Sequence, residues 1–168
     1  GKMLSFTSSL SKDTDGIAIF VNEKYSYRDN KNILSKNATQ KINSFLSVLK
    51  AKKVEEEVSS LDISEKQKCF VIKVKNKYAS YSPQESGGSF FSYLKNSKNI
   101  KKIDFYVDSL DFDKDKLVSF FSQFIFGFQL KSYTFNKYRT QNKEKFNKKI
   151  DFKIITKEKQ KIEKKYKY

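Results

Sequence analysis

The feature that most constrains the fold of this chain is a pair of short, largely apolar runs, of which the first is continuous. Residues 16–21 (GIAIFV) form the first run and residues 69–74 (CFVIKV) form the second. Apolar runs of this length are typical of strands that are buried on both faces of a sheet. A third strand is predicted at residues 103–107 (IDFYV).

Segments with helical periodicity separate these runs. In residues 37–50 the apolar side chains recur every three or four positions, with Asn37 as candidate N-cap and Gln40 as its capping-box partner. Residues 113–130 form the most apolar helix, which needs cover on more than one face. Strands that alternate with helices predict an α/β domain with a mixed or mostly parallel sheet.

The remaining elements are less strongly marked. We expect a turn at residues 83–88, because Pro83 and the adjacent glycines Gly87 and Gly88 are frequent in turns. A phosphate could bind at these glycines, which precede a helix, but neither the Walker pattern nor the dinucleotide fingerprint is present. Phe90, Phe91 and Leu94 then fit a short helix. The other expected elements are an edge strand within residues 52–63, short strands at 3–7 and 152–155, and a charged helix at 157–168.

The length of 168 residues suits one domain. We assign residues 3–156 to that domain and residues 157–168 to a charged connection toward a further, C-terminal domain. Gly1 and Lys2, which precede Met3, are interpreted as a cloning remnant.

We expect a soluble, cytoplasmic protein with no membrane partner. The sequence after Met3 turns polar within a few residues, unlike a secretory signal, and the apolar stretch at 120–130 is too short to span a bilayer. Cys69 is the only cysteine, so no intrachain disulfide can form, which fits a reducing compartment.

The net charge of +16 allows two interpretations. It indicates an anionic partner, such as nucleic acid or an acidic membrane surface. However, 33 of the 35 cationic side chains are lysine, and Asn, Ile, Phe and Tyr are also abundant. An AT-rich coding sequence produces this composition without selection for binding, and phosphate recognition favours arginine.

The sequence offers no set of catalytic residues. It has no histidine, which removes the commonest general base and metal ligand, and one cysteine cannot complete a Cys/His zinc site. Cys69 sits in an apolar strand and is interpreted as packed core. Asp111, Asp113 and Asp115 resemble the start of a calcium loop, but Lys116 occupies the position that requires glycine.

Residues 131–140 interleave cationic and aromatic side chains. Lys131, Lys137 and Arg139 are candidate anion contacts, because aromatic rings between cations can stack bases while the cations bind phosphates. The alternation of Tyr133 and Phe135 equally suits a segment that is pinned to the core.

The segment 126–140 (FGFQLKSYTFNKYRT) resembles the end of the N-terminal domain in the leucyl aminopeptidase (cytosol aminopeptidase) family. In that family a long helix containing a glycine leads into a Ser-Tyr-x-Phe-x-x-Tyr-Lys run. The order of strands and helices over most of the chain agrees as well. The residues that match the run are Gly127, Leu130, Ser132, Tyr133, Phe135, Tyr138 and Arg139.

The resemblance implies a macro-like α/β fold and a non-catalytic role in assembly or regulation. Members of the family remove N-terminal residues from peptides with a two-metal zinc or manganese site in a C-terminal domain, and they form homo-hexamers. The family's Asn-Thr-Asp-Ala-Glu-Gly-Arg metal motif is not in this chain, so no catalytic or metal-binding residue is assigned here. Some bacterial members also bind DNA.

Three functional hypotheses remain open at this point. The chain is the N-terminal domain of a metallo-aminopeptidase whose partners are its own catalytic domain and neighbouring subunits. Alternatively it is a basic nucleic-acid-binding module, or a macro-type binder of ADP-ribose.

Overall fold

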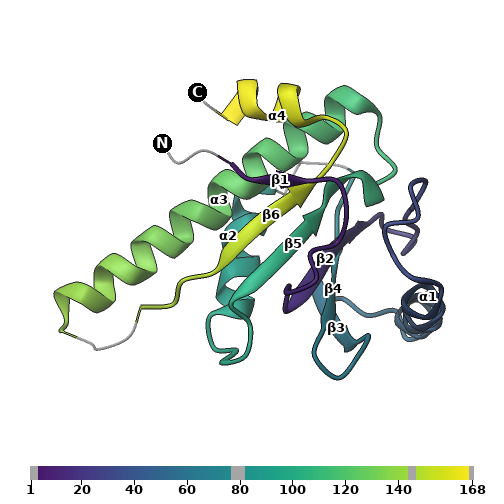
Figure 1. The fold of residues 1–168 in the computed structure, drawn as a ribbon, viewed down its shortest axis with the longest axis horizontal. Helices are drawn as coiled ribbons and strands as arrows, with labels where there is room; N and C mark the ends of the chain where they lie inside the picture. The colour runs from purple at the N-terminus through teal and green to yellow at the C-terminus, as the bar shows by residue number, and fades with distance from the viewer. Residues whose placement is uncertain (1–3, 77–81, 144–146, 167–168) are drawn as a thin grey trace.

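A six-stranded sheet organises the protein, as shown by a computed structural model that describes residues 4–76, 82–143 and 147–166 (Figure 1). The strand order is β1-β6-β5-β2-β4-β3, and only the β3–β4 pair is antiparallel. The prediction of a mixed, mostly parallel sheet is therefore confirmed. The strands are β1 (Phe6–Thr7), β2 (Gly16–Val21), β3 (Val58–Asp62), β4 (Lys68–Lys73), β5 (Lys102–Tyr106) and β6 (Asp151–Ile155).

Helices cover both faces of the sheet. Helix α1 (Lys36–Ala51) packs on one face, and α2 (Pro83–Leu94), α3 (Lys114–Gln141) and α4 (Lys159–Tyr166) lie on the other (Figure 1). A single 3-10 turn, Val107–Ser109, follows β5. The chain is thus one α/β domain with a layer of helices on each side.

The central strand β2 explains how one sheet holds two cores. All six of its residues are buried. Successive side chains of a strand point to opposite faces, so Ala18 and Phe20 face α2 and α3, while Ile17 and Ile19 face α1. The continuous apolar run in the sequence therefore reflects burial on both sides.

Phenylalanine rings fill the core between the sheet and α3. The rings of Phe20 and Phe124 lie 5.1 Å apart between centroids, and those of Phe105 and Phe128 lie 5.4 Å apart. Both pairs are edge-to-face, which is a favourable aromatic geometry. Each of the four side chains is at most 1% exposed.

Two glycines set the distance between α2 and α3. A Cβ added to Gly87 would overlap the carbonyl oxygen of Phe124, and one added to Gly127 would overlap the carbonyl oxygen of Gln84. The two helix backbones therefore touch where these glycines cross. Glycine is the residue that permits such an approach.

The predicted turn at residues 83–88 is wrong, because these residues form the first half of α2. Ser82 caps this helix through the backbone N–H of Glu85 at 3.2 Å, and Pro83 occupies the first turn, where its missing N–H costs nothing. Both glycines lie inside the helix, and Gly87 supplies the close contact with α3. They cannot form a phosphate-binding loop.

Two helix ends also differ from the prediction. Helix α1 is capped by Ser35, whose hydroxyl accepts the N–H of Ala38 at 3.1 Å, rather than by Asn37. Helix α3 begins after Asp113, as predicted, but continues beyond Leu130 to Gln141. Residues 131–140 are therefore helical.

The remaining expectations are largely confirmed. The edge strand within 52–63 is β3, and the strand at 152–155 is β6. The strand at 3–7 is β1, although residue 3 lies outside the described residues, as do Gly1 and Lys2. Cys69 is fully buried, and burial raises the pKa of its thiol.

Substitution of the three helical glycines tests the α2–α3 contact. Gly87→Ala and Gly127→Ala should each lower the free energy of unfolding by about 1–3 kcal/mol, because the added methyl pushes the helices apart. The matched control is Gly88→Ala, whose Cβ would lie 3.6 Å from the nearest heavy atoms. That variant should be stabilised by roughly 0.5–1 kcal/mol, the usual gain of alanine over glycine in a helix.

The measurement is equilibrium unfolding in urea. Equal effects at all three glycines would contradict the close approach of the two helices.

Candidate functional site

The C-terminal half of α3 extends past the edge of the sheet (Figure 1). It carries large apolar side chains that face solvent. Phe126 is 47% exposed, Leu130 is 44% exposed and Tyr133 is 65% exposed. Because these three positions are separated by four and three residues, they share one face of the helix.

This face forms one wall of a groove with a volume of about 1070 Å³, which we call the α3 groove. Its α3 wall runs from Phe126 to Gln141. Ile150 and Phe152 contribute apolar surface on the side of β6, and Tyr166 contributes the end of α4. The groove's polar residues include Ser11, Asp13, Lys102, Asp104, Asn136, Lys137, Lys149, Asp151 and Lys153.

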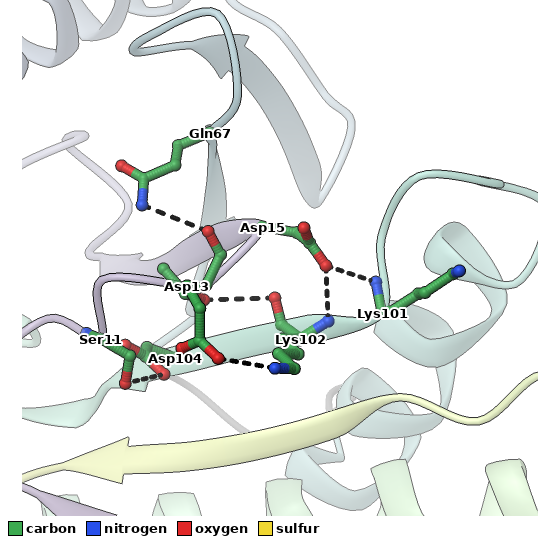
Figure 2. A network of polar contacts seen from close by, with 8 residues as sticks. Ser11, Asp13, Asp15, Gln67, Lys101, Lys102 and Asp104 are labelled. Carbon is green, nitrogen blue, oxygen red and sulfur yellow. Dashed lines mark hydrogen bonds and ion pairs between the residues drawn. The ribbon is translucent and has the colours of Figure 1, made fainter.

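A network of polar contacts holds the end of the groove that lies by β5 (Figure 2). The segment between β1 and β2 is tied to β5 through Asp104. The Ser11 backbone N–H donates to Asp104 Oδ2 at 2.7 Å, and the Ser11 hydroxyl donates to Oδ1 at 3.3 Å. Asp104 is only 2% exposed, so these two donors compensate in part for its burial.

The same network fixes the amino end of β5. One carboxylate oxygen of Asp15 accepts the backbone N–H groups of Lys101 and Lys102, at 2.8 and 2.9 Å (Figure 2). The Lys102 ammonium forms an ion pair with Asp13 at 2.6 Å. These contacts keep the β1–β2 segment in place beside the groove.

Burial and charge shift these carboxyl groups in opposite directions. Desolvation raises the pKa of Asp104, although the Ser11 donors and Lys153 oppose the shift. The hydrogen bond from Lys102 lowers the pKa of Asp13, and the same pair raises the pKa of Lys102.

The three candidate anion contacts do not lie on one surface. Lys137 faces the α3 groove, with its Nζ 6.0 Å from the ring centroid of Tyr133. Arg139 lies over the ring of Phe135 at 5.3 Å, on the side of the helix toward α2, where Phe135 contacts Phe91. With about 100° per residue, Lys131 falls on that second side as well.

The residues of the family-like run also lie on different sides of α3, some toward α2 and some toward the α3 groove. Gly127 is buried against α2, and Phe135 is half-buried with its ring 5.8 Å from that of Phe91. Leu130, Ser132 and Tyr133 line the groove. Tyr138, at 61% exposed, faces solvent outside the groove, and Arg139 covers Phe135.

At the carboxyl ends of β2 and β5, where ligands bind in many α/β sheets, the described side chains form hydrogen bonds within the chain. Asn22 Nδ2 donates to Asp111 at 2.9 Å, and the Tyr106 hydroxyl donates to Asp29 at 2.6 Å. Arg28 also donates two hydrogen bonds, to backbone carbonyls of residues 108 and 112. Neither of the two described pockets lies at this edge.

Within residues 4–76, 82–143 and 147–166, no group of three or more His, Cys, Asp or Glu side chains is placed to hold a metal ion. Asp113, which the sequence suggested as a calcium ligand and then excluded, caps α3 through the N–H of Lys116 at 3.0 Å. Over the same residues, no helix combines the length and apolarity needed to cross a membrane.

Sequence reasoning did not identify the groove or Asp104. The groove is formed by residues far apart in the chain, and no local pattern connects them. One signal was present: Phe126 lies off the main apolar stripe of the helix at 113–130. A further feature visible only in the structure is Gln129, whose buried Oε1 has no hydrogen-bond partner among the described residues.

Comparison with known proteins supports the fold. No protein-family model matches the sequence, and no curated protein matches it at a significant level. A solved mutant of tomato leucine aminopeptidase superimposes on 97% of this chain with a TM-score of 0.61 and 16% identity. This chain spans 35% of the length of that protein.

The macrodomain of DarG from Thermus aquaticus is also similar in structure. It covers 93% of this chain and 99% of its own, with a TM-score of 0.57 and 9% identity. The chain is therefore similar in fold both to a macrodomain and to part of a leucine aminopeptidase, and the macro-like fold is confirmed.

The opposite pKa shifts of Asp104 and Asp13 predict opposite pH dependences. The raised pKa of Asp104 favours the neutral carboxyl in the folded state, so its contribution to stability is lost as pH rises from the ordinary aspartate pKa through the raised one. Asp104→Asn should therefore be most stable relative to the parent chain near neutral pH, and this advantage should shrink below about pH 4.

Asp13→Asn is the matched control. The lowered pKa of Asp13 stabilises the fold above the ordinary aspartate pKa, and this contribution is lost as pH falls. Thermal unfolding of the three proteins between about pH 3 and 7 measures both trends. A difference between Asp104→Asn and the parent chain that does not change with pH would contradict the role given to burial.

Proposed function

We propose that this chain is the non-catalytic N-terminal domain of a metal-dependent leucyl aminopeptidase, with a role in assembly or regulation. The observation that carries the proposal is that 97% of the chain superimposes on about a third of a leucine aminopeptidase. The family-like run supports the same assignment. The resemblance implies a long helix that contains a glycine and leads into the run, and α3 is a long helix that contains both Gly127 and the run. In this proposal residues 157–168 lead toward the catalytic domain.

In this proposal the catalytic reaction takes place outside the present chain. Removal of N-terminal residues from peptides would take place in a C-terminal domain that binds zinc or manganese, and the present chain would contribute no catalytic residue. The parent protein would be a cytoplasmic homo-hexamer.

The α3 groove is the surface through which the domain would act. An exposed apolar face of this kind marks an interaction site when it is contiguous and rimmed by polar groups. Phe126, Leu130 and Tyr133 provide the apolar centre, and Lys137 and Lys153 are among the charged groups around it. A docking role explains why α3 continues beyond the sheet that it covers.

A basic nucleic-acid-binding module is the first alternative, and the net charge of +16 favours it. The structure supports a nucleic-acid-binding function less than the sequence does. The three candidate cations lie on two sides of α3, so they do not form one phosphate-binding surface.

A ligand-binding macrodomain is the second alternative, favoured by the likeness to a complete macrodomain. Fold alone does not determine function. The glycines that could have formed a phosphate loop, Gly87 and Gly88, instead lie inside α2.

The first functional prediction concerns activity. The purified chain should hydrolyse no leucyl substrate, such as leucine p-nitroanilide, with or without added manganese. A protein expressed from the full native reading frame should show turnover that a chelator abolishes. Metal-dependent turnover by the isolated chain would contradict the proposal.

The second prediction concerns ADP-ribose. Calorimetric titration of the chain with ADP-ribose should give no binding heat, because the carboxyl edge of the sheet is occupied by its own hydrogen bonds. Saturable binding that is lost when Asn22 or Asp29 is replaced by alanine would instead support the macrodomain alternative.

A further inference from the structure

The exposed face of α3 has the spacing of a helix-pairing seam. Phe126, Leu130, Tyr133 and Lys137 are separated by four, three and four residues. This is the spacing at which one helix packs its side chains into another, and a lysine can occupy a single position of such a seam. A face of this kind is complementary to a second helix.

The first half of α3 shows how a helix packs here. Helix α4 lies against it and buries Ile162 completely. Ion pairs flank this contact, between Lys161 and Asp115 at 3.6 Å and between Lys114 and Glu158 at 3.8 Å. Helix α4 ends at the groove, where Tyr166 forms part of the lining.

The groove has room for a helix along the second half of α3. The lining residues of α3 run from Phe126 to Gln141, a length of about 22 Å at 1.5 Å per residue. Ile150 and Phe152 provide apolar surface on the other wall.

The charges of the groove favour an acidic occupant. Lys137, Lys149 and Lys153 line it and form no ion pair with any described residue. Of the carboxylates, Asp13 is paired with Lys102 and Asp104 is bonded to Ser11. Asp151 also lines the groove without an ion pair among the described residues, so three lysines stand against one such carboxylate. The remaining charge is therefore positive, and a helix with flanking carboxylates would complement it.

We propose that the α3 groove binds an acidic amphipathic helix of a partner protein domain, with apolar side chains packed on Phe126, Leu130 and Tyr133. This inference rests on the docking role proposed above and specifies its chemistry. A second copy of this chain is a poor occupant, because each copy carries a charge of +16. The mode of recognition is an amphipathic helix in an apolar groove.

The test uses a fluorescein-labelled helical peptide of about three heptads, with Leu at alternating spacings of three and four and Glu on both sides of the Leu stripe. Fluorescence anisotropy measures its binding to the chain. Its partner peptide has every Glu replaced by Lys. We expect the acidic peptide to bind at least about tenfold more tightly than the basic one.

Substitutions in the groove should weaken this binding without affecting the fold. The double variant Leu130→Gln and Tyr133→Gln should bind the acidic peptide about tenfold more weakly. Its matched control is Val48→Gln on α1, where the side chain is 46% exposed outside the groove and the affinity should not change. Circular dichroism of each variant verifies that the chain is folded.

A charge exchange identifies the lysines as the source of selectivity. Lys137→Glu combined with Lys149→Glu should reverse the preference, so that the basic peptide binds more tightly than the acidic one. Lys31→Glu combined with Lys36→Glu, two exposed lysines outside the groove, should leave the preference unchanged.

Three outcomes would overturn the inference. They are equal binding of the two peptides, an affinity that is indifferent to the groove variants, and displacement of the acidic peptide by oligo(dT) with tighter binding of the oligonucleotide. The last result would favour nucleic acid as the occupant. None of these results bears on the aminopeptidase assignment, which the activity of the full reading frame tests separately.

Discussion

The contact between α2 and α3 at Gly87 and Gly127 determines how the rest of the molecule is arranged. Because neither residue has a side chain, the two helix backbones meet directly, and this fixes the position of α3 over the sheet. Phe124, one helical turn before Gly127, is thereby directed onto β2, and Phe128, the residue after Gly127, is directed onto β5. The largest core of the protein is built on this crossing.

The functional surface follows from the same contact. Helix α3 has 28 residues, more than are needed to cover the sheet, so that its second half extends past the crossing with α2. The exposed apolar side chains of this second half line the α3 groove. The hydrogen bonds from Ser11 to Asp104 hold the β1–β2 segment at the end of that groove. The surface proposed for docking therefore depends on two features. Gly87 and Gly127 position α3, and the buried Asp104 holds the β1–β2 segment beside it.

The sequence predicts the sheet well and the helix contacts poorly, for physical reasons that particular residues illustrate. The runs at 16–21 and 69–74 identify buried strands, because burial on both faces leaves no polar position in the first run and only Lys73 in the second. Gly87 and Gly88 predict a turn because glycine normally weakens a helix, and only the approach of α3 explains why a glycine stands at position 87. Helix α3 was predicted to end at Leu130, because its apolar pattern changes there from a core-facing stripe to a solvent-exposed one. The groove could not be predicted, because residues from several segments that are far apart in the chain form it.

The central claim is that the exposed face of α3 is covered in the native protein. Hydroxyl-radical footprinting tests it by comparing the isolated chain with the protein made from the full native reading frame. Oxidation of Phe126, Leu130 and Tyr133 should slow markedly in the full protein, while Val48 on α1 should be oxidised at the same rate in both. Unchanged oxidation of the three groove residues would contradict the account.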